Sequence, residues 1–206
     1  MAVGDQPVVR GRHMKALVAA LEGWPGGTRP LALLPADPLR IIASASGLDW
    51  LPVALNLQVT QATYQGLGAL EADRFFRAQT MASFEGPILQ TMVSTAVRMF
   101  GLDPASFARW VPRAWHMIFR EVGDWTVGAL PPGATAVPLT LARLPAECAD
   151  HPVWLRSVSH SLSALFDLAR VHGAATLSPR APGAREAVFE LRWTARLEAA
   201  GRPPAA

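Results

Sequence analysis

Cysteine and histidine side chains that could bind a metal ion occur together in one part of the chain. Cys148 and His151 have the two-residue gap of a metal-binding pair, and His160 follows further along. A structural zinc site needs four ligands in two spaced pairs, whereas the sequence contains one cysteine and no second local pair. We therefore interpret Cys148 as a lone thiol and His151 as a residue near a helix start, and we assign no metal site.

A different chemistry is open to His116, which follows Trp115 in a segment predicted to be an apolar helix. An imidazole in such a helix could bind haem iron from the proximal side, which would make the chain a gas or redox sensor. A histidine beside a tryptophan more often packs against its neighbours or faces solvent. Haem binding is therefore kept as an alternative, and no cofactor is assigned.

A Ser-His-Asp set can be assembled from His160, Asp167 and one serine of the same segment: Ser157, Ser159 or Ser161. If this segment is a helix, His160 and Asp167 lie two turns apart, about 10 Å along the axis, which is beyond hydrogen-bond reach. The sequence also lacks a Gly-x-Ser-x-Gly turn, a glycine-rich phosphate loop and paired carboxylates on one helix face. We predict a non-enzymatic protein without catalytic residues.

The elements that would position these groups fall into two halves. In the first half, apolar residues recur at helical spacing from Trp50 to Tyr64, from Phe75 to Phe100 with a break at Gly86-Pro87, and after Asp103 with a second break at Pro112. The pattern then changes to two strands, a helix and two more strands: 124–130, 136–144, 151–172, 174–177 and 187–193. We predict an α+β fold, with a helical N-terminal half followed by a β-β-α-β-β antiparallel sheet that has helices packed on one face.

Composition limits the classes of protein to which the chain can belong. Half of its 206 residues are apolar, which favours one domain over residues 1–200 with a flexible tail at 201–206. Residues 1–7 lack the regions of a signal peptide, and Gly86 to Val97 is too short to cross a bilayer, so we expect a cytoplasmic protein without a membrane span. The net charge is only +3 and the arginines are scattered, which argues against nucleic-acid binding.

Two apolar groups of residues are candidates for function. Trp110, Trp115, Phe119 and Trp125 gather around the junction of helices and sheet, where a pocket for a hydrophobic small ligand is easiest to build. The second group lies on a helix that is apolar nearly all round and must be covered, either by this domain or by a second copy in a homodimer or other homo-oligomer. Its proposed self-association residues are Ile88, Met92, Val93 and Phe100.

Five short motifs occur in order along the chain: Val9-Arg10-Gly11-Arg12, Trp50-Leu51-Pro52, the segment 109–115, Gly123 and Phe189-Glu190-Leu191-Arg192-Trp193. In these motifs, residues 8–193 resemble an uncharacterised, myxobacteria-restricted family of single-domain proteins with a domain of unknown function. This resemblance implies a single domain and names no ligand or reaction.

The second half also resembles, more distantly, the ligand-binding group of 4-vinyl-reductase, haem-nitric-oxide-binding and transport-particle-subunit domains. The resemblance implies a module that binds a ligand or dimerises. The metal-binding cysteines of the vinyl-reductase branch are missing from 177–189, and the Tyr-x-Ser-x-Arg signature of the haem branch is absent because Tyr64 is followed by Gln65-Gly66. We therefore predict a non-enzymatic regulatory or scaffolding module that acts through its apolar pocket or its self-association surface. The alternative is a sensor that binds a hydrophobic small molecule or haem.

Overall fold

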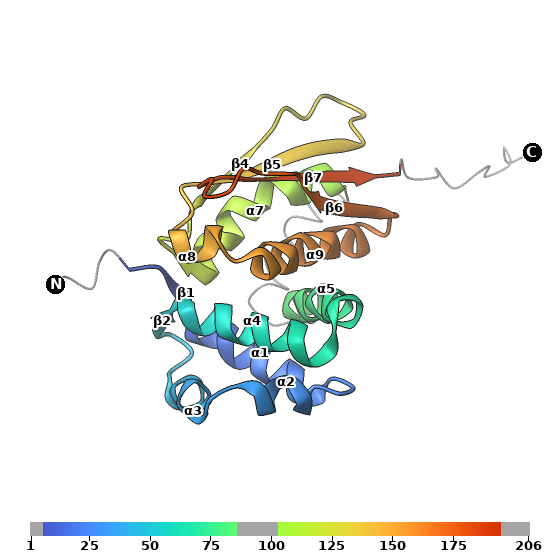
Figure 1. The fold of residues 1–206 in the computed structure, drawn as a ribbon. Coiled ribbons are helices and arrows are strands. Elements are labelled where there is room, and N and C mark those ends of the chain that lie inside the picture. The colour runs from blue at the N-terminus through green and yellow to red at the C-terminus, as the bar shows by residue number, and fades with distance from the viewer. Residues whose placement is uncertain (1–5, 86–102, 195–206) are drawn as a thin grey trace, which may run out of the picture.

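The computed structural model describes residues 6–85 and 103–194, and in it the chain forms a helical part beneath a sheet-containing part (Figure 1). The self-association residues predicted between 88 and 100 lie outside the described residues. The N-terminal part consists of these elements: β1 (Val8–Arg10), α1 (Gly11–Gly23), α2 (Thr28–Leu33), α3 (Ala36–Ser44), β2 (Trp50–Pro52), α4 (Val53–Leu67) and α5 (Ala69–Glu85).

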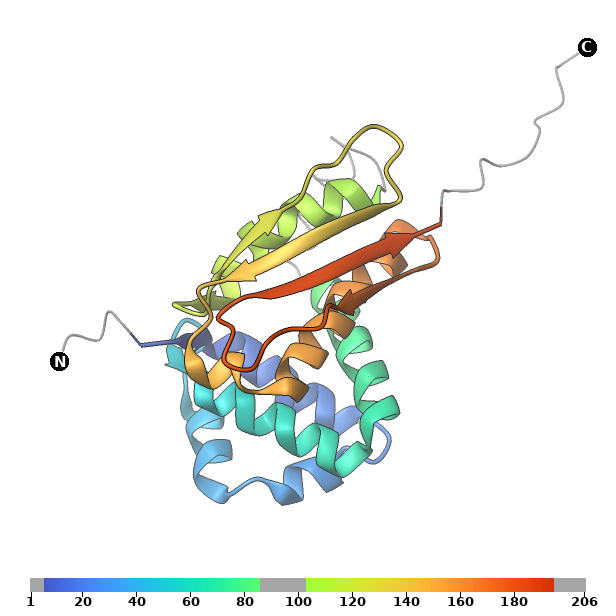
Figure 2. The same cartoon turned by 45° about the horizontal axis from the view of Figure 1, so that its top comes forward.

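The C-terminal part contains a four-stranded antiparallel sheet of order β4-β5-β7-β6, and Figure 2 shows helices along one of its faces. The α+β fold with helices packed on one face is therefore confirmed. The elements of this part are α7 (Pro104–Ile118), β3 (Phe119–Arg120), β4 (Asp124–Val127), β5 (Ala136–Ala142), α8 (Ala146–Ala149), α9 (Pro152–Ala169), β6 (Gly173–Leu177) and β7 (Ala187–Trp193).

Buried and more exposed residues alternate along the strands of this sheet, which gives it one covered face. Leu139 of β5 pairs with Phe189 of β7, and both are fully buried, whereas Pro138 between the buried residues of β5 is exposed. Successive side chains of a strand point to opposite faces, so one face of the sheet supplies core residues and the other faces solvent. Helices α7 and α9 pack on the core face.

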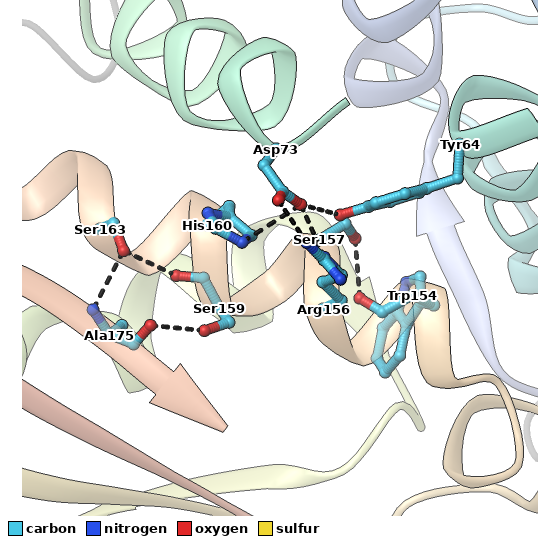
Figure 3. Close-up of polar contacts among 9 residues, drawn as sticks. All are labelled: Tyr64, Asp73, Trp154, Arg156, Ser157, Ser159, His160, Ser163 and Ala175. Atoms are coloured by element: carbon cyan, nitrogen blue, oxygen red, sulfur yellow. Dashed lines mark hydrogen bonds and ion pairs between the residues drawn. The ribbon is translucent and has the colours of Figure 1, made fainter. Parts of the chain in front are cut away.

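Helix α9 also satisfies the backbone of the edge strand β6. The Ser159 hydroxyl donates a hydrogen bond to the carbonyl oxygen of Ala175 at 2.6 Å, and the Ala175 amide donates to Ser163 Oγ at 3.0 Å (Figure 3). An edge strand otherwise leaves such groups open to pairing with another chain. These two serines therefore hold the helix against the sheet.

A second, three-stranded sheet of order β2-β1-β3 joins the two parts of the fold, and it corrects the expectation of an all-helical first half. The apolar spacing predicts a helix from Trp50, but Trp50–Pro52 forms β2, and α4 begins at Val53. Pro52 disfavours helical backbone at Leu51, which pairs instead with Val9 of β1. Because β1 also pairs with β3, the end of α7 is fixed to the N-terminal part.

Helix α7 confirms one sequence signal and contradicts another. The helix begins after Asp103, as the apolar spacing predicts, and Asp103 caps it, since its carboxylate accepts hydrogen bonds from the amides of Ala105 and Ser106. The expected break at Pro112 is wrong, because α7 continues through it to Ile118. Proline removes one backbone hydrogen bond, a loss that burial of Val111 and Trp115 on either side offsets.

A membrane-spanning role would need a long apolar helix. Within residues 6–85 and 103–194, no helix has the length and hydropathy to cross a bilayer.

Candidate functional site

A cavity of about 460 Å³ lies where the helical part meets α7, α9 and the sheet. Its wall is made mostly of apolar side chains from α1, α4, α5, α7 and α9, with Phe119 of β3 and Trp125 of β4. Ligand sites are concave, mostly apolar and about 300–1,000 Å³ in volume. The cavity therefore has the size and chemistry of a site for a hydrophobic small molecule.

All four residues proposed for an apolar pocket line this cavity: Trp110, Trp115, Phe119 and Trp125. Trp115 is the centre of the group, because its ring lies 4.3 Å from Phe119 and 5.5 Å from Trp125, measured between ring centroids. It also contacts Trp154 of α9 edge-on at 6.1 Å. The structure thus brings the four residues together in one wall, and their role in binding a ligand is a proposal.

The histidine considered for haem, His116, faces away from this cavity. One helical residue is a rotation of about 100°, so with Trp115 buried against the cavity its neighbour points elsewhere. The His116 side chain is 56% exposed, and its Nε2 lies 3.5 Å from Asp124 Oδ1. His116 is therefore wrong as a cavity ligand, because helix α7 presents its other stripe to the interior.

The cavity contains a different histidine, His13 of α1, which the sequence reasoning missed. Burial lowers the pKa of His13 to about 4, so its imidazole is neutral near pH 7. A neutral imidazole keeps the lone pair that a metal ion needs. The signal that could have found it is helical spacing: His13 lies four residues before Leu17, a core residue that also lines the cavity.

Helix α9 contributes a cavity face that the sequence analysis did not single out. Trp154, Val158, Leu162 and Leu165 recur along this face at helical spacing, and Ser161 lies among them. The Trp154 indole donates a hydrogen bond to Asn56 Oδ1 at 2.8 Å, so the polar edge of this ring is satisfied within the wall. Small side chains such as Ser161 and Ala114 leave room where larger ones would fill the space.

The neighbouring face of α9 carries a dense polar cluster centred on Asp73 of α5 (Figure 3). Its carboxylate accepts hydrogen bonds from the Tyr64 hydroxyl at 2.9 Å and from two nitrogens of Arg156 at 2.9 and 2.6 Å. His160 Nε2 lies 3.1 Å from the same carboxylate. The cluster ties α4 and α5 to α9 and is already fully paired.

Electrostatics in this cluster favour an ionised Asp73. Burial raises the pKa of its carboxyl, but the hydrogen bonds from Arg156 and Tyr64 and the charge of His160 together bring the pKa below its usual value. Burial and the hydrogen bond to Asp73 raise the pKa of Tyr64, which stays a neutral donor. Burial lowers the pKa of His160, and the charge of Asp73 acts in the opposite direction.

The residues weighed for catalysis are placed in separate contacts. His160 meets Asp73, whereas Asp167 forms a two-bond ion pair with Arg77 of α5 at 2.6 and 2.7 Å. The Ser157 hydroxyl donates to the carbonyl oxygen of Trp154. No Ser-His-Asp arrangement forms from these groups.

The residues considered for metal binding have separate structural roles. Burial raises the pKa of the Cys148 thiol to about 12, and His151 caps α9 by accepting the Trp154 amide hydrogen at Nδ1. Within the described residues, no group of three or more histidine, cysteine or carboxylate side chains could hold a metal ion.

Comparison with solved structures identifies the architecture. The H-NOX protein from K. algicida in its Fe(II) unliganded form superimposes with a TM-score of 0.64 and 10% identity, over 91% of this chain and 98% of that one. The chain has the H-NOX fold. The S. oneidensis H-NOX protein in its Fe(II)NO ligation state gives a TM-score of 0.59 at 14% identity, covering 90% and 99% of the two chains. A mutant H-NOX protein from T. tengcongensis gives 0.57 at 7% identity, covering 90% and 98%.

These matches confirm the predicted likeness to haem-nitric-oxide-binding domains at the level of the fold. No family model matches the chain, and no curated protein matches it. The predicted relationship to a myxobacterial family therefore has no support from the comparisons.

Proposed function

We propose that the chain is a sensor domain that binds a hydrophobic small molecule in the cavity between the helical part and the sheet, with haem as the first occupant to test. The observation that carries the proposal is a 460 Å³ apolar cavity in an H-NOX fold. The solved proteins with this fold include forms with Fe(II) and with Fe(II)NO. This evidence favours the sensor alternative over a scaffolding or self-association role, and the proposed role is binding without catalysis.

The chemistry of the cavity wall is compatible with haem. His13 is the one histidine among the described lining residues, and its low pKa leaves it neutral and able to coordinate iron. Bound haem would supply an iron centre able to take a diatomic gas. The Tyr-x-Ser-x-Arg signature of the haem branch is absent, so His13 and the apolar wall are the residues we assign to holding the group.

Charge at the wall supports a ligand with acidic groups, which haem has in its two carboxylates. Arg10 and Arg12 belong to the lining, and none of the described lining residues is an aspartate or glutamate. The Arg10 guanidinium stacks over the Trp50 ring at 3.8 Å and donates to the carbonyl oxygen of Leu48. The positive charge of the two arginines favours anions over cations.

The first experiment titrates the purified full-length chain with haemin and follows visible absorption. We expect a haem-protein band in the wild type and in His116→Ala, and loss or a clear shift of that band in His13→Ala. The two variants are matched because each removes one histidine, one in the cavity wall and one exposed. A band that depends on His116 and not on His13 would overturn the assignment of the iron ligand.

A second experiment tests the cavity itself, whatever its occupant. Ala114→Phe places a ring into the wall of the cavity, and Ala43→Phe places the same ring on the exposed side of α3. We expect native mass spectrometry to show a bound small molecule in the wild type and in Ala43→Phe, and loss of that molecule in Ala114→Phe. Equal ligand content in all three proteins would contradict binding in this cavity.

A further inference from the structure

Two indole groups in the cavity wall have no hydrogen-bond acceptor within residues 6–85 and 103–194. Trp115 Nε1 and Trp125 Nε1 are buried and have no partner among the described residues. The two side chains are 9% and 5% exposed and come from different elements, α7 and β4. Trp154, another indole of the wall, donates to Asn56, so an unpaired indole is not a general feature of this site.

An unpaired buried donor is unusual and calls for an explanation. Most buried polar groups in proteins are hydrogen-bonded, and a missing ligand is one reason why a group stands alone. Here two such groups lie side by side, with ring centroids 5.5 Å apart and ring planes at 87°. Both rings therefore belong to the same part of the cavity wall.

The chemistry of the two indoles restricts that group. An indole N–H donates and cannot accept, so it recognises an acceptor and offers nothing to an amine or an ammonium group. The arginines at the wall and the lack of acidic residues among the described lining residues also favour an acceptor over an ammonium group. Oxygen atoms of a carbonyl or a carboxylate meet these requirements.

We infer that the ligand has an apolar body and a carbonyl or carboxylate oxygen that accepts hydrogen bonds from the indoles of Trp115 and Trp125. This inference rests on the proposed function, because it assumes that the cavity binds a ligand. It adds the chemical class of that ligand and the two residues that select it.

The test uses two probes of the same shape, 2-acetylnaphthalene and 2-isopropenylnaphthalene, which differ only in a C=O group replaced by C=CH₂. Binding to the full-length protein is measured by equilibrium dialysis. We expect the wild type to bind the ketone about tenfold more tightly than the alkene, because only the ketone accepts hydrogen bonds. Trp115→Phe and Trp125→Phe should each reduce this preference, and the double variant should bind the two probes equally.

Trp154→Phe is the matched control, because it changes an indole of the same wall whose N–H is already paired. It should keep the preference for the ketone. The alkene corrects for altered packing, since its affinity reports the shape of the cavity without a hydrogen bond. A third probe, 2-naphthoate, separates the two oxygen types: tighter binding than the ketone indicates a carboxylate, and weaker binding indicates a neutral carbonyl.

Failure of this inference is distinguishable from failure of the proposed function. Equal binding of ketone and alkene by the wild type would show a working apolar site and overturn the role of the two indoles. A ketone preference that survives in the double variant would overturn it as well. If no naphthalene probe binds and haemin gives no band, the cavity is not a binding site and both proposals are wrong.

Discussion

Helix α9 has two neighbouring faces whose chemistry differs in one respect, the pairing of polar groups. On the face toward α5, the buried carboxylate of Asp73 meets Tyr64, Arg156 and His160. On the face toward the cavity, the Trp154 indole is paired, but the indoles of Trp115 and Trp125 have no hydrogen-bond partner among the described residues. A fully paired buried network stabilises and orients its helices, whereas an incomplete one is stabilised by whatever completes it. The comparison indicates that the Asp73 cluster is structural, and it supports our proposal that a ligand binds in the cavity.

The same contrast appears in the two histidines of these regions. His160 lies beside a carboxylate whose charge favours its protonated form, while burial opposes that form. His13 lies in the cavity wall, where burial alone lowers its pKa to about 4. Protonation of His13 in the cavity wall is therefore less favourable than protonation of His160 in the polar cluster.

The largest expected effect on stability comes from the Asp73 cluster. Asp73→Asn removes the charge that Arg156 and Tyr64 share, and we expect a loss of about 3 kcal/mol in the free energy of unfolding, because the buried Asp73 carboxylate loses its charge-assisted hydrogen bonds, although Arg156 is half exposed. Urea unfolding at pH 7 measures it. Asp37→Asn is the control, because the Asp37–Arg40 pair is exposed and should contribute under about 0.5 kcal/mol. Equal effects of the two substitutions would show that the cluster has no structural role.

The second prediction concerns pH and the cavity. The pKa of His13 is about 4 when folded and 6.5 when unfolded, so the unfolded chain binds more protons between these values. The contribution of neutral His13 is present above pH 6.5 and is lost as pH falls toward 4. We expect His13→Gln to remove about 2 kcal/mol of the stability difference between pH 7 and pH 5, measured by urea unfolding at both values. An unchanged pH dependence would contradict the burial of a neutral imidazole.

The third prediction compares one substitution at two places in the aromatic wall. Trp154→Phe leaves Asn56 Oδ1 without its donor, whereas Trp115→Phe removes an N–H that has no acceptor among the described residues. Both lose similar volume, so we expect Trp154→Phe to be less stable than Trp115→Phe by about 1 kcal/mol in the ligand-free protein. Thermal unfolding of the two variants side by side checks this. The reverse order would mean that Trp115 has an acceptor.

The smallest expected effect is at the ion pair between Arg77 and Asp167. Both side chains are more than a third exposed, at 37% and 39%, so solvent screens their attraction. We expect Asp167→Asn to lower the free energy of unfolding by about 0.5 kcal/mol and to leave haemin binding unchanged. A loss as large as that of Asp73→Asn would erase the distinction between buried and exposed pairs on α9.

Much of the fold followed from local patterns. The strands around Leu139 and Phe189 follow from alternation, and the start of α7 follows from Asp103 before proline, because both depend on neighbours along the chain. The helix start predicted at Trp50 and the break predicted at Pro112 failed for a tertiary reason. Pairing with β1 makes Trp50 part of a strand, and packing keeps α7 helical through Pro112.

The candidate site was only partly predictable. The tryptophan-rich junction pointed to Trp115 and Trp125 because bulky apolar residues gather where layers meet, and both line the cavity. His116 was the wrong histidine because its orientation depends on which stripe of α7 faces inward. His13 was missed because it lies far from Trp115 along the chain. The Asp73 cluster was missed for the same reason, since its members come from three helices.

The sequence by itself determined the classes of element, their order and the face of each strand that is buried, because apolar periodicity acts over a few residues. Only the tertiary structure decided which polar groups are paired. The hydrogen bond between Asp73 and Arg156 depends on atoms brought within about 3 Å by the packing of distant segments, and so does the lack of an acceptor for Trp115 and Trp125 among the described residues. Pairing is the property that separates the structural side of α9 from the side we assign to a ligand.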